Sequence, residues 1–212
     1  MHKDNFTQEG KGPCSRKDTS SFLDVIFKSL YESGEYSEAD IRDEINTMVF
    51  AGSDTAANTL SFLFLMLATF PDIQNQVYEE LYDLYGSSDP NEVPITMEDT
   101  KKMKYLDRVI KETLRLFPAA PFIARKLYRD TRGIFTYNKI FFSIYFCPLT
   151  LVSYIVIICQ KFGMTQMRVI AATLLRKFLV RIDNPVSVEN IDLKFRITLQ
   201  PAETIFLRFN KR

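Results

Sequence analysis

The sequence predicts a mainly α-helical fold with a small β part close to its C-terminus. Apolar residues recur at helical spacing over most of residues 21–116 and resume that spacing from residue 160, which is the pattern of amphipathic helices. Stretches that alternate apolar and polar residues follow, and they predict strands. With 212 residues, of which 46% are hydrophobic, the chain suits one domain, or part of a larger one, with a real core.

The N-terminal part predicts a lead-in and two helices. Residues 1–20 are polar and contain two glycines and a proline, which favours a flexible segment. A short amphipathic helix follows and ends at Gly34. Ser37 is followed three residues later by Asp40, which resembles a capping box, and a long apolar helix then runs to about Phe70.

Three more helical starts and a strand precede the next change in composition. A helix over 71–85 begins at a proline, which suits the first turn of a helix. Thr96 and Asp99 cap the next helical start, and apolar spacing predicts a helix over 105–116, which prolines end. Residues 121–126 then predict a short strand.

The composition changes abruptly at Gly133. Residues 140–158 contain 19 positions without a charge, broken by one proline, so their length makes them a candidate membrane span. Helical spacing resumes over 160–178, and alternation predicts strands at 193–199 and 205–209. We therefore divide the chain into four parts, namely 1–20, 21–133, 134–158 and 159–212.

Charge and rare residue types exclude several function classes. With 27 basic against 26 acidic residues, the formal net charge is +1, and no block of like charge favours a nucleic-acid ligand. The only histidine, His2, lies in a polar terminus, so the sequence disfavours histidine-based catalysis and zinc binding. The three cysteines, at positions 14, 147 and 159, show no CxxC spacing and favour a reducing compartment.

A motif inside the long predicted helix offers the first candidate chemistry. In AGSDT, residues 51–55, an alanine and a glycine remove side-chain bulk, and the Thr55 hydroxyl can bond the backbone. Asp54 and Thr55 form an acid–alcohol pair that can pass protons from solvent to a buried reacting centre, which is general acid catalysis by relay. Taken alone, such a pair is more often solvated or locally hydrogen-bonded.

A second motif, ETLR at residues 112–115, places an acid and a base on one helix face. Glu112 and Arg115 are three residues apart, so the carboxylate and the guanidinium can pair and can also reach a third group. In isolation such a motif is usually an exposed ion pair. The apolar residues and prolines around it indicate that the helix packs on a core, so we expect a partly buried pair with an architectural role.

These motifs and the text around them resemble a known family over residues 41–130. DEINTMVFAGSDTAANTLSF resembles the long oxygen-activating helix of the cytochromes P-450, which are haem-thiolate monooxygenases. FPDIQNQVYEEL resembles the family's next helix, and MKYLDRVIKETLRLFPAAPFIARK its Glu-x-x-Arg helix and following strand. The chain is most similar to the family-four branch of animals, including insects, whose members hydroxylate fatty acids near the chain end. The implied fold is an incomplete C-terminal portion of the cytochrome P-450 fold.

The resemblance implies a reaction and residue roles. One oxygen atom of O2 would enter a C–H bond of a lipophilic substrate such as a fatty acid, with electrons from NADPH through a reductase. Asp54 and Thr55 would deliver protons to the oxygen that the haem activates, and Glu112 and Arg115 would support the haem-binding side. The haem b would not be covalently attached, because Ala51 stands where this branch often carries an ester-forming glutamate. The implied location is the cytoplasmic face of the endoplasmic reticulum membrane, with the anchor expected outside this chain.

The iron ligand is the main departure from the family. The pattern Phe-x-x-Gly-x-Arg-x-Cys-x-Gly, laid on Cys159, requires four residues that the chain lacks. The helix from Gln160 resembles the one after the family's cysteine in a register that places this cysteine at Ile157, so Cys159 is two residues out of register. Residues 134–158 then indicate either a translated intron or a membrane helix. Cys159 is the candidate metal ligand, although such a cysteine is more often a buried or membrane-exposed free thiol. Two functions stay open: a haem monooxygenase represented here by an incomplete sequence, or a non-enzymatic remnant without the haem-thiolate loop that associates with a membrane or a partner.

Overall fold

The computed structural model describes Asp24, Val25, Lys28, Gly34 and residues 36–121 and 153–212, with the backbone alone for residues 153–159. The chain forms two compact units, Met1–Val49 and Phe50–Arg212. All but the first residue of the strand expected at 121–126, and most of the short helix expected before Gly34, lie outside the described residues. Our four-part division of the chain remains a prediction.

The long predicted helix is confirmed as α2, Glu38–Thr69. A capping box starts it: the Asp40 backbone N–H donates to the Ser37 hydroxyl at 3.2 Å, and the Ser37 backbone N–H donates to the Asp40 carboxylate at 2.9 Å. These bonds satisfy donors that the first turn of a helix leaves free, and they lower the pKa of Asp40. The helix then runs for 32 residues, passing through the AGSDT motif without interruption.

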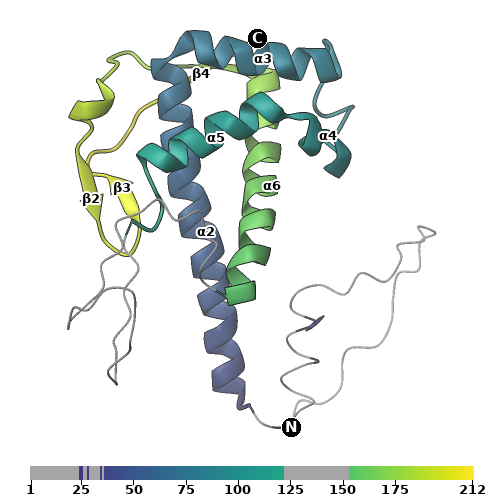
Figure 1. Cartoon of the computed structure of the whole chain (residues 1–212), viewed down its shortest axis with the longest axis vertical. Coiled ribbons are helices and arrows are strands. Elements are labelled where there is room, and N and C mark those ends of the chain that lie inside the picture. The colour runs from purple at the N-terminus through teal and green to yellow at the C-terminus, as the bar shows by residue number, and fades with distance from the viewer. Residues whose placement is uncertain (1–23, 26–27, 29–33, 35, 122–152) are drawn as a thin grey trace, which may run out of the picture. The chain divides into compact units, whose positions relative to one another are not determined.

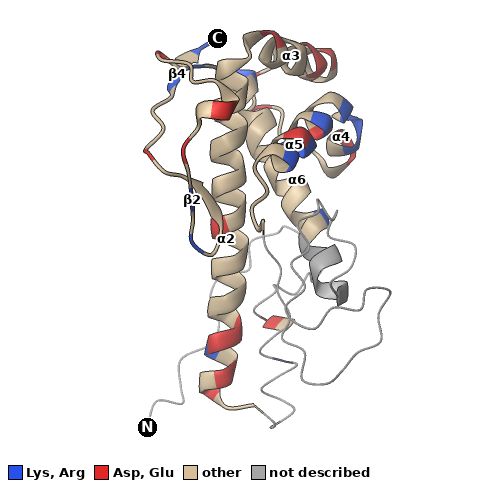
Figure 2. Ribbon diagram, turned by 60° about the vertical axis from the view of Figure 1, so that its left-hand side comes forward, with Lys and Arg blue, Asp and Glu red and all other residues tan. Residues whose placement is uncertain are grey.

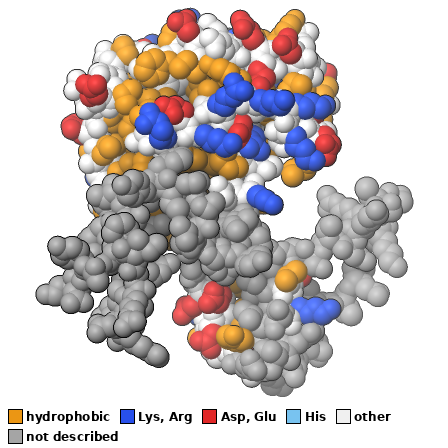
Figure 3. Space-filling view, viewed as in Figure 1, with side chains coloured by type: hydrophobic (Ala, Val, Ile, Leu, Met, Phe, Trp, Pro, Cys, Tyr) orange, Lys and Arg blue, Asp and Glu red, His pale blue; other side chains and the backbone are white. Residues whose placement is uncertain are grey.

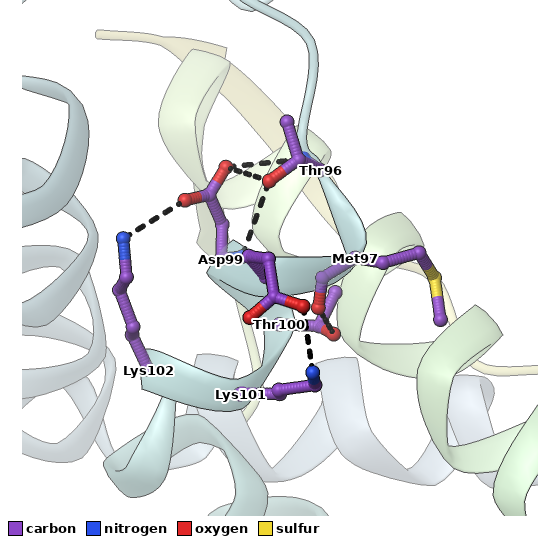
Figure 4. A network of polar contacts seen from close by, with 7 residues as sticks. Thr96, Met97, Asp99, Thr100, Lys101 and Lys102 are labelled. Carbon is purple, nitrogen blue, oxygen red and sulfur yellow. Dashed lines mark hydrogen bonds and ion pairs between the residues drawn. The ribbon is translucent and has the colours of Figure 1, made fainter.

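Three shorter helices also lie where the sequence predicts them: α3 (Pro71–Tyr85), α4 (Met97–Lys102) and α5 (Lys104–Leu116). Gly86 ends α3 at φ 59°, a conformation that glycine adopts without strain. A second capping box starts α4, where the Asp99 backbone N–H donates to the Thr96 hydroxyl at 3.2 Å (Figure 4). Hydrogen bonds that Thr96 donates in return lower the pKa of Asp99 to about 2.

The last helix, α6, spans Ser153–Lys177 and leads directly into strand β1, Phe178–Arg181. The helix begins seven residues before the expected start at Gln160. Phe178, which we expected on the helix, is the first residue of β1 and pairs with Lys211 of β4 (Arg208–Lys211). That expectation was wrong because apolar residues continue from α6 into β1, and aromatic and β-branched residues favour a strand there.

The C-terminal segment forms a hairpin in place of one of the predicted strands. Residues 193–199 divide into β2 (Leu193–Phe195) and the start of β3 (Leu199–Pro201), which pair antiparallel. The chain reverses between them, where the Arg196 backbone N–H donates to the Thr198 carbonyl at 3.2 Å. Alternation of apolar and polar residues does not reveal a tight reversal, so one strand was predicted. The strand predicted at 205–209 is shifted toward the C-terminus, as β4, and the predicted antiparallel β part is confirmed as two two-stranded sheets.

One hydrophobic core joins the helices of the larger unit. The C-terminal half of α2 lies beside α6, α5 crosses them, and α3 lies across their ends (Figure 1). The residues at the centre of this core are fully or almost fully buried: Leu63, Leu67, Val77, Leu81, Leu106, Ile110, Ala171 and Leu175. Within each helix these core residues are four positions apart, which places them on one helical face. On α5 the buried face carries Leu106 and Ile110, not Tyr105 and Val109, the positions on which the sequence-based prediction of this helix relied.

The predicted membrane span at 140–158 lies mostly outside the described residues, which include its last six positions as backbone of α6. Within the described part of the chain, no single helix is both long and apolar enough to cross a membrane, although α2 and α3, bent by 107°, together meet that criterion of length and composition.

Candidate functional site

The acid–alcohol pair lies on α2, within the larger unit. The Thr55 hydroxyl donates to the Ala51 carbonyl at 2.7 Å, one turn back along the helix, as the sequence predicted. Ala51 is exposed, and among the described residues no atom beyond the neighbouring helix backbone lies within 4 Å of a Cβ placed at Gly52. The helix therefore presents an open surface of small residues next to a hydroxyl that can exchange its backbone acceptor for another one.

Asp54 is held by two side chains that the sequence analysis did not single out. Thr198 donates its hydroxyl hydrogen to Asp54 Oδ2 at 2.5 Å, and Asn58 Nδ2 approaches the same oxygen at 3.3 Å. Asn58 Nδ2 also donates to Thr198 Oγ1 at 3.0 Å, which closes a triangle of hydrogen bonds. The helical spacing of four residues could have indicated Asn58. No sequence signal indicates Thr198, because it lies 144 residues from Asp54.

A second hydrophobic cluster places Thr198 beside α2. Phe62 of α2 stacks on Phe117, which follows α5, with ring centroids 4.3 Å apart and planes 2° from parallel. Leu199 packs on this cluster, and its backbone N–H donates to the Ala119 carbonyl at 3.0 Å. Thr198 is consequently only 4% exposed, while Asp54 and Asn58 are half-buried. The β2–β3 hairpin thus brings a buried hydroxyl to the carboxylate.

Glu112 and Arg115 pair on α5 with both ends of the guanidinium fork. Arg115 Nε donates to Glu112 Oε2 at 2.8 Å, and Arg115 Nη2 donates to Oε1 at 2.7 Å. The hydrogen bonds that Arg115 donates lower the pKa of Glu112. The pair is exposed, with 55% of the Arg115 side chain and 58% of the Glu112 side chain accessible, so the expectation of partial burial was wrong. The pair is exposed because of helical periodicity: Leu106, Ile110 and Thr113 occupy the face of α5 that packs on the core, which leaves Glu112 and Arg115 on another face.

Two polar contacts fix α5, the helix that carries this pair. Glu80 of α3 accepts the backbone N–H groups of Tyr105 and Leu106 at 2.6 and 2.9 Å, so a side chain from another helix caps α5. Asp107 pairs with Arg168 of α6 and with Lys111. Burial opposes ionisation of Asp107, but the hydrogen bonds from these two basic groups lower its pKa overall.

Basic side chains gather on the face that α4 and α5 present (Figures 2 and 3). Lys101 with Glu98, Lys111 with Asp107 and Arg115 with Glu112 form ion pairs within α4 or α5, and the basic side chain of each pair is more than half exposed. Among the described residues, no hydrogen bond or ion pair joins Glu112 or Arg115 to the Asp54 network. The two predicted motifs are therefore separate groups on α5 and α2.

A haem site of this kind needs an iron ligand on one side and proton-delivering groups on the other. The oxygen atoms and small residues of the AGSDT motif fit its proton-delivering side. The backbone of Cys159 lies in α6, and its side chain falls outside what the structure describes, as do the other two cysteines. Residues 36–121 and 160–212 contain no cysteine, and among them no three His, Asp or Glu side chains form a group that could hold a metal ion. The fit is thus confined to the acid–alcohol side.

Comparison with known proteins identifies the family. The cytochrome P450 family model matches residues 1–132. Cytochrome P450 4V2 of Mus musculus is 42% identical over 130 residues, which cover 60% of this chain and 24% of that protein. Cytochrome P450 4d1 of Drosophila melanogaster is 34% identical over 138 residues, covering 61% and 27%. The chain thus spans about a quarter of the length of these relatives.

A solved structure shows the same fold. The crystal structure of a cytochrome P450, CYP102L1, superposes with a TM-score of 0.67 and 24% identity, covering 84% of this chain and 47% of that one. Its fold includes the arrangement described above, so the mainly helical architecture is part of a cytochrome P450 fold. Because the family model matches more than half of its residues, the chain belongs to the cytochrome P450 family.

Proposed function

We propose that this chain provides the proton-delivering helix of a haem monooxygenase, which inserts one oxygen atom of O2 into a C–H bond of a lipophilic substrate such as a fatty acid. The observation that supports it is the acid–alcohol pair on α2, with Asp54 held by hydrogen bonds beside the open surface at Gly52. The family of the chain and its relatives of the P450 4 group favour this reaction over others.

The reaction consumes protons, and the pair on α2 is built to supply them. Insertion of one oxygen atom and reduction of the other to water takes two electrons and two protons for each O2. When bound, haem b supplies the activation of O2, and its thiolate ligand favours cleavage of the O–O bond. Asp54 is half-buried, so it can exchange a proton with solvent. The Thr55 hydroxyl now donates its hydrogen to the Ala51 carbonyl, and it can instead donate this hydrogen to a reacting oxygen at the open surface.

Electrons would come from NADPH through a reductase. The basic face of α4 and α5 suits a partner with an acidic surface, since complementary charge steers association. We place the protein on the cytoplasmic face of the endoplasmic reticulum membrane, where lipophilic substrates concentrate. The haem would be held without a covalent bond, because Ala51 offers no carboxylate to form an ester.

Cys159 is our candidate iron ligand, and residues 134–158 are the part of the chain that puts it in question. The family match ends at residue 132, next to the predicted boundary at 133. The positions where the family pattern needs Phe, Gly, Arg and Gly around Cys159 carry Val152, Ile155, Ile157 and Lys161. This observation favours the second candidate function, a non-enzymatic remnant that associates with a membrane or a partner.

The spectrum of the reduced protein with carbon monoxide separates the two candidates. The whole chain is expressed with haem available, and bound haem is counted per chain. One haem per chain with a thiolate-type spectrum supports the monooxygenase. Failure of the chain to bind haem stoichiometrically supports the remnant. If Cys159 is the ligand, Cys159→Ser abolishes the thiolate-type spectrum; an unchanged spectrum in that variant excludes Cys159 as the ligand.

A further inference from the structure

We infer that Thr198 is a positioning residue for Asp54: its buried hydroxyl fixes one carboxylate oxygen and leaves the other to carry protons. This inference rests on the proposed monooxygenase function for its catalytic meaning. Its geometric part, the contact between the β2–β3 hairpin and α2, stands on hydrogen bonds alone.

The hydrogen bonds around Asp54 are divided unequally between its two oxygens. Oδ2 accepts from the Thr198 hydroxyl at 2.5 Å and from Asn58 Nδ2 at 3.3 Å. Among the described residues, Oδ1 has no hydrogen-bond partner. A carboxylate with one oxygen bound and one oxygen open keeps its orientation while it exchanges a proton with water or with a neighbouring hydroxyl.

The hydroxyl of Thr198 can only donate to Asp54 and accept from its other partners. A hydroxyl has one hydrogen to donate, and an ionised carboxylate only accepts, so the hydrogen of Thr198 points to Asp54. Its lone pairs are then available to Asn58 Nδ2 at 3.0 Å and to Gln200 Nε2 at 3.4 Å. Donors on both sides of the hydroxyl oxygen thus fix the direction of its hydrogen, and burial of the side chain to 4% excludes competing water.

Loss of this contact would release the carboxylate without removing it. Asp54 would then turn between rotamers, and a proton would reach the reacting oxygen less often in the required geometry. Reducing equivalents would be diverted, since O2, NADPH and H+ give H2O2 and NADP+ when no oxygen atom is inserted. The expected signature is therefore a change in the partition between hydroxylated product and peroxide, which simple loss of stability would not produce.

The test compares three variants, two at Thr198 and one at a control threonine that is equally buried. Thr198→Val keeps the shape and removes the hydroxyl, and Thr198→Ser restores it. Thr100→Val is the matched control, because Thr100 is also 4% exposed and its hydroxyl donates only to the Met97 carbonyl of its own helix, at 2.7 Å. All three are checked for folding by circular dichroism before use.

The first readout needs no haem. The carboxyl carbon resonance of Asp54, assigned by its loss in Asp54→Asn, should move in Thr198→Val, return to the parent position in Thr198→Ser and stay unchanged in Thr100→Val. An Asp54 resonance that is the same in Thr198→Val and in the parent chain overturns the inference, whatever the haem content.

The second readout uses the haem-loaded chain with a reductase. The ratio of hydroxylated fatty acid to NADPH consumed should fall about tenfold in Thr198→Val, the order of one hydrogen bond to a charged group, and recover in Thr198→Ser. An unchanged ratio overturns the positioning role. If the parent chain binds no haem, the proposed function fails, and the carboxyl resonance still decides whether Thr198 positions Asp54.

Discussion

Gln74 of α3 is the residue whose replacement we expect to destabilise the larger unit most clearly. Its side chain is 0% exposed, and its amide joins two elements that are far apart in sequence. Nε2 donates to the Leu67 carbonyl of α2 at 2.8 Å and to the Val180 carbonyl of β1 at 2.9 Å. Oε1 accepts the Val180 backbone N–H at 2.8 Å. One side chain therefore satisfies three buried backbone groups.

Gln74→Leu keeps a similar volume and leaves those three groups without their side-chain partner. An unsatisfied buried polar group costs about 1–3 kcal/mol, and part of this cost is relieved by local relaxation or entry of water. We therefore expect the free energy of unfolding to fall by about 3–5 kcal/mol, which is a large part of the stability of an ordinary domain. Because β1 pairs with β4, amide exchange should also accelerate at both strands before the rest of the unit opens.

Urea denaturation, followed by circular dichroism, measures the change. Gln76→Leu serves as the matched control, since Gln76 lies on the same helix and is exposed, and its effect should stay within about 0.5 kcal/mol. If Gln74→Leu were as stable as Gln76→Leu, the three hydrogen bonds would not anchor β1 and the reasoning would be refuted.

Three further predictions concern the charged and polar contacts between helices. The lowered pKa of Asp107 means that this carboxylate stabilises the folded state above its ordinary pKa of 3.8, and that the stabilisation is lost as the pH falls through the folded-state pKa. Asp107→Asn should therefore flatten the acid limb of a plot of unfolding free energy against pH, and an unchanged limb would contradict this. Burial, and then the charge of Asp99, raises the pKa of Tyr85 to about 12, so the folded state loses stability as the pH rises from 10 to 12. Subtracting the ultraviolet titration curve of Tyr85→Phe from that of the parent chain should reveal a phenol with a pKa of about 12. A difference curve with its midpoint at pH 10.0 would refute the prediction. Glu80→Ala should cost about 1–2 kcal/mol by uncapping α5, against no measurable loss in the exposed control Glu79→Ala, and equal midpoints would argue against the cap.

Local signals in the sequence predicted most helices and their starts. Capping boxes at Ser37 and Thr96, and the proline and glycine that flank α3, act within a few residues, so they can be read from a short window. The junction of α6 and β1 was missed because Phe178 continues an apolar pattern, and the pairing that makes it a strand comes from β4 at the C-terminus. The β2–β3 reversal was missed for a similar reason.

The candidate site was predictable only in part. The Asp54–Thr55 pair and the Glu112–Arg115 pair belong to short contiguous motifs, so the amino-acid sequence alone indicated them. The exposure of Glu112 depends on which face of α5 packs on the core, which the apolar residues Leu106 and Ile110 determine in three dimensions. Thr198 could not be found from sequence, because only the folded hairpin brings it to α2.

Incorporation of labelled oxygen tests the proposed function most directly. The whole chain, supplied with haem, NADPH and a reductase, is incubated with a fatty acid under 18O2, and the product is analysed by mass spectrometry. We expect one 18O atom in each hydroxylated product and loss of most product in Asp54→Asn. Absence of labelled product from a haem-loaded parent chain, or full product yield from Asp54→Asn, would contradict it.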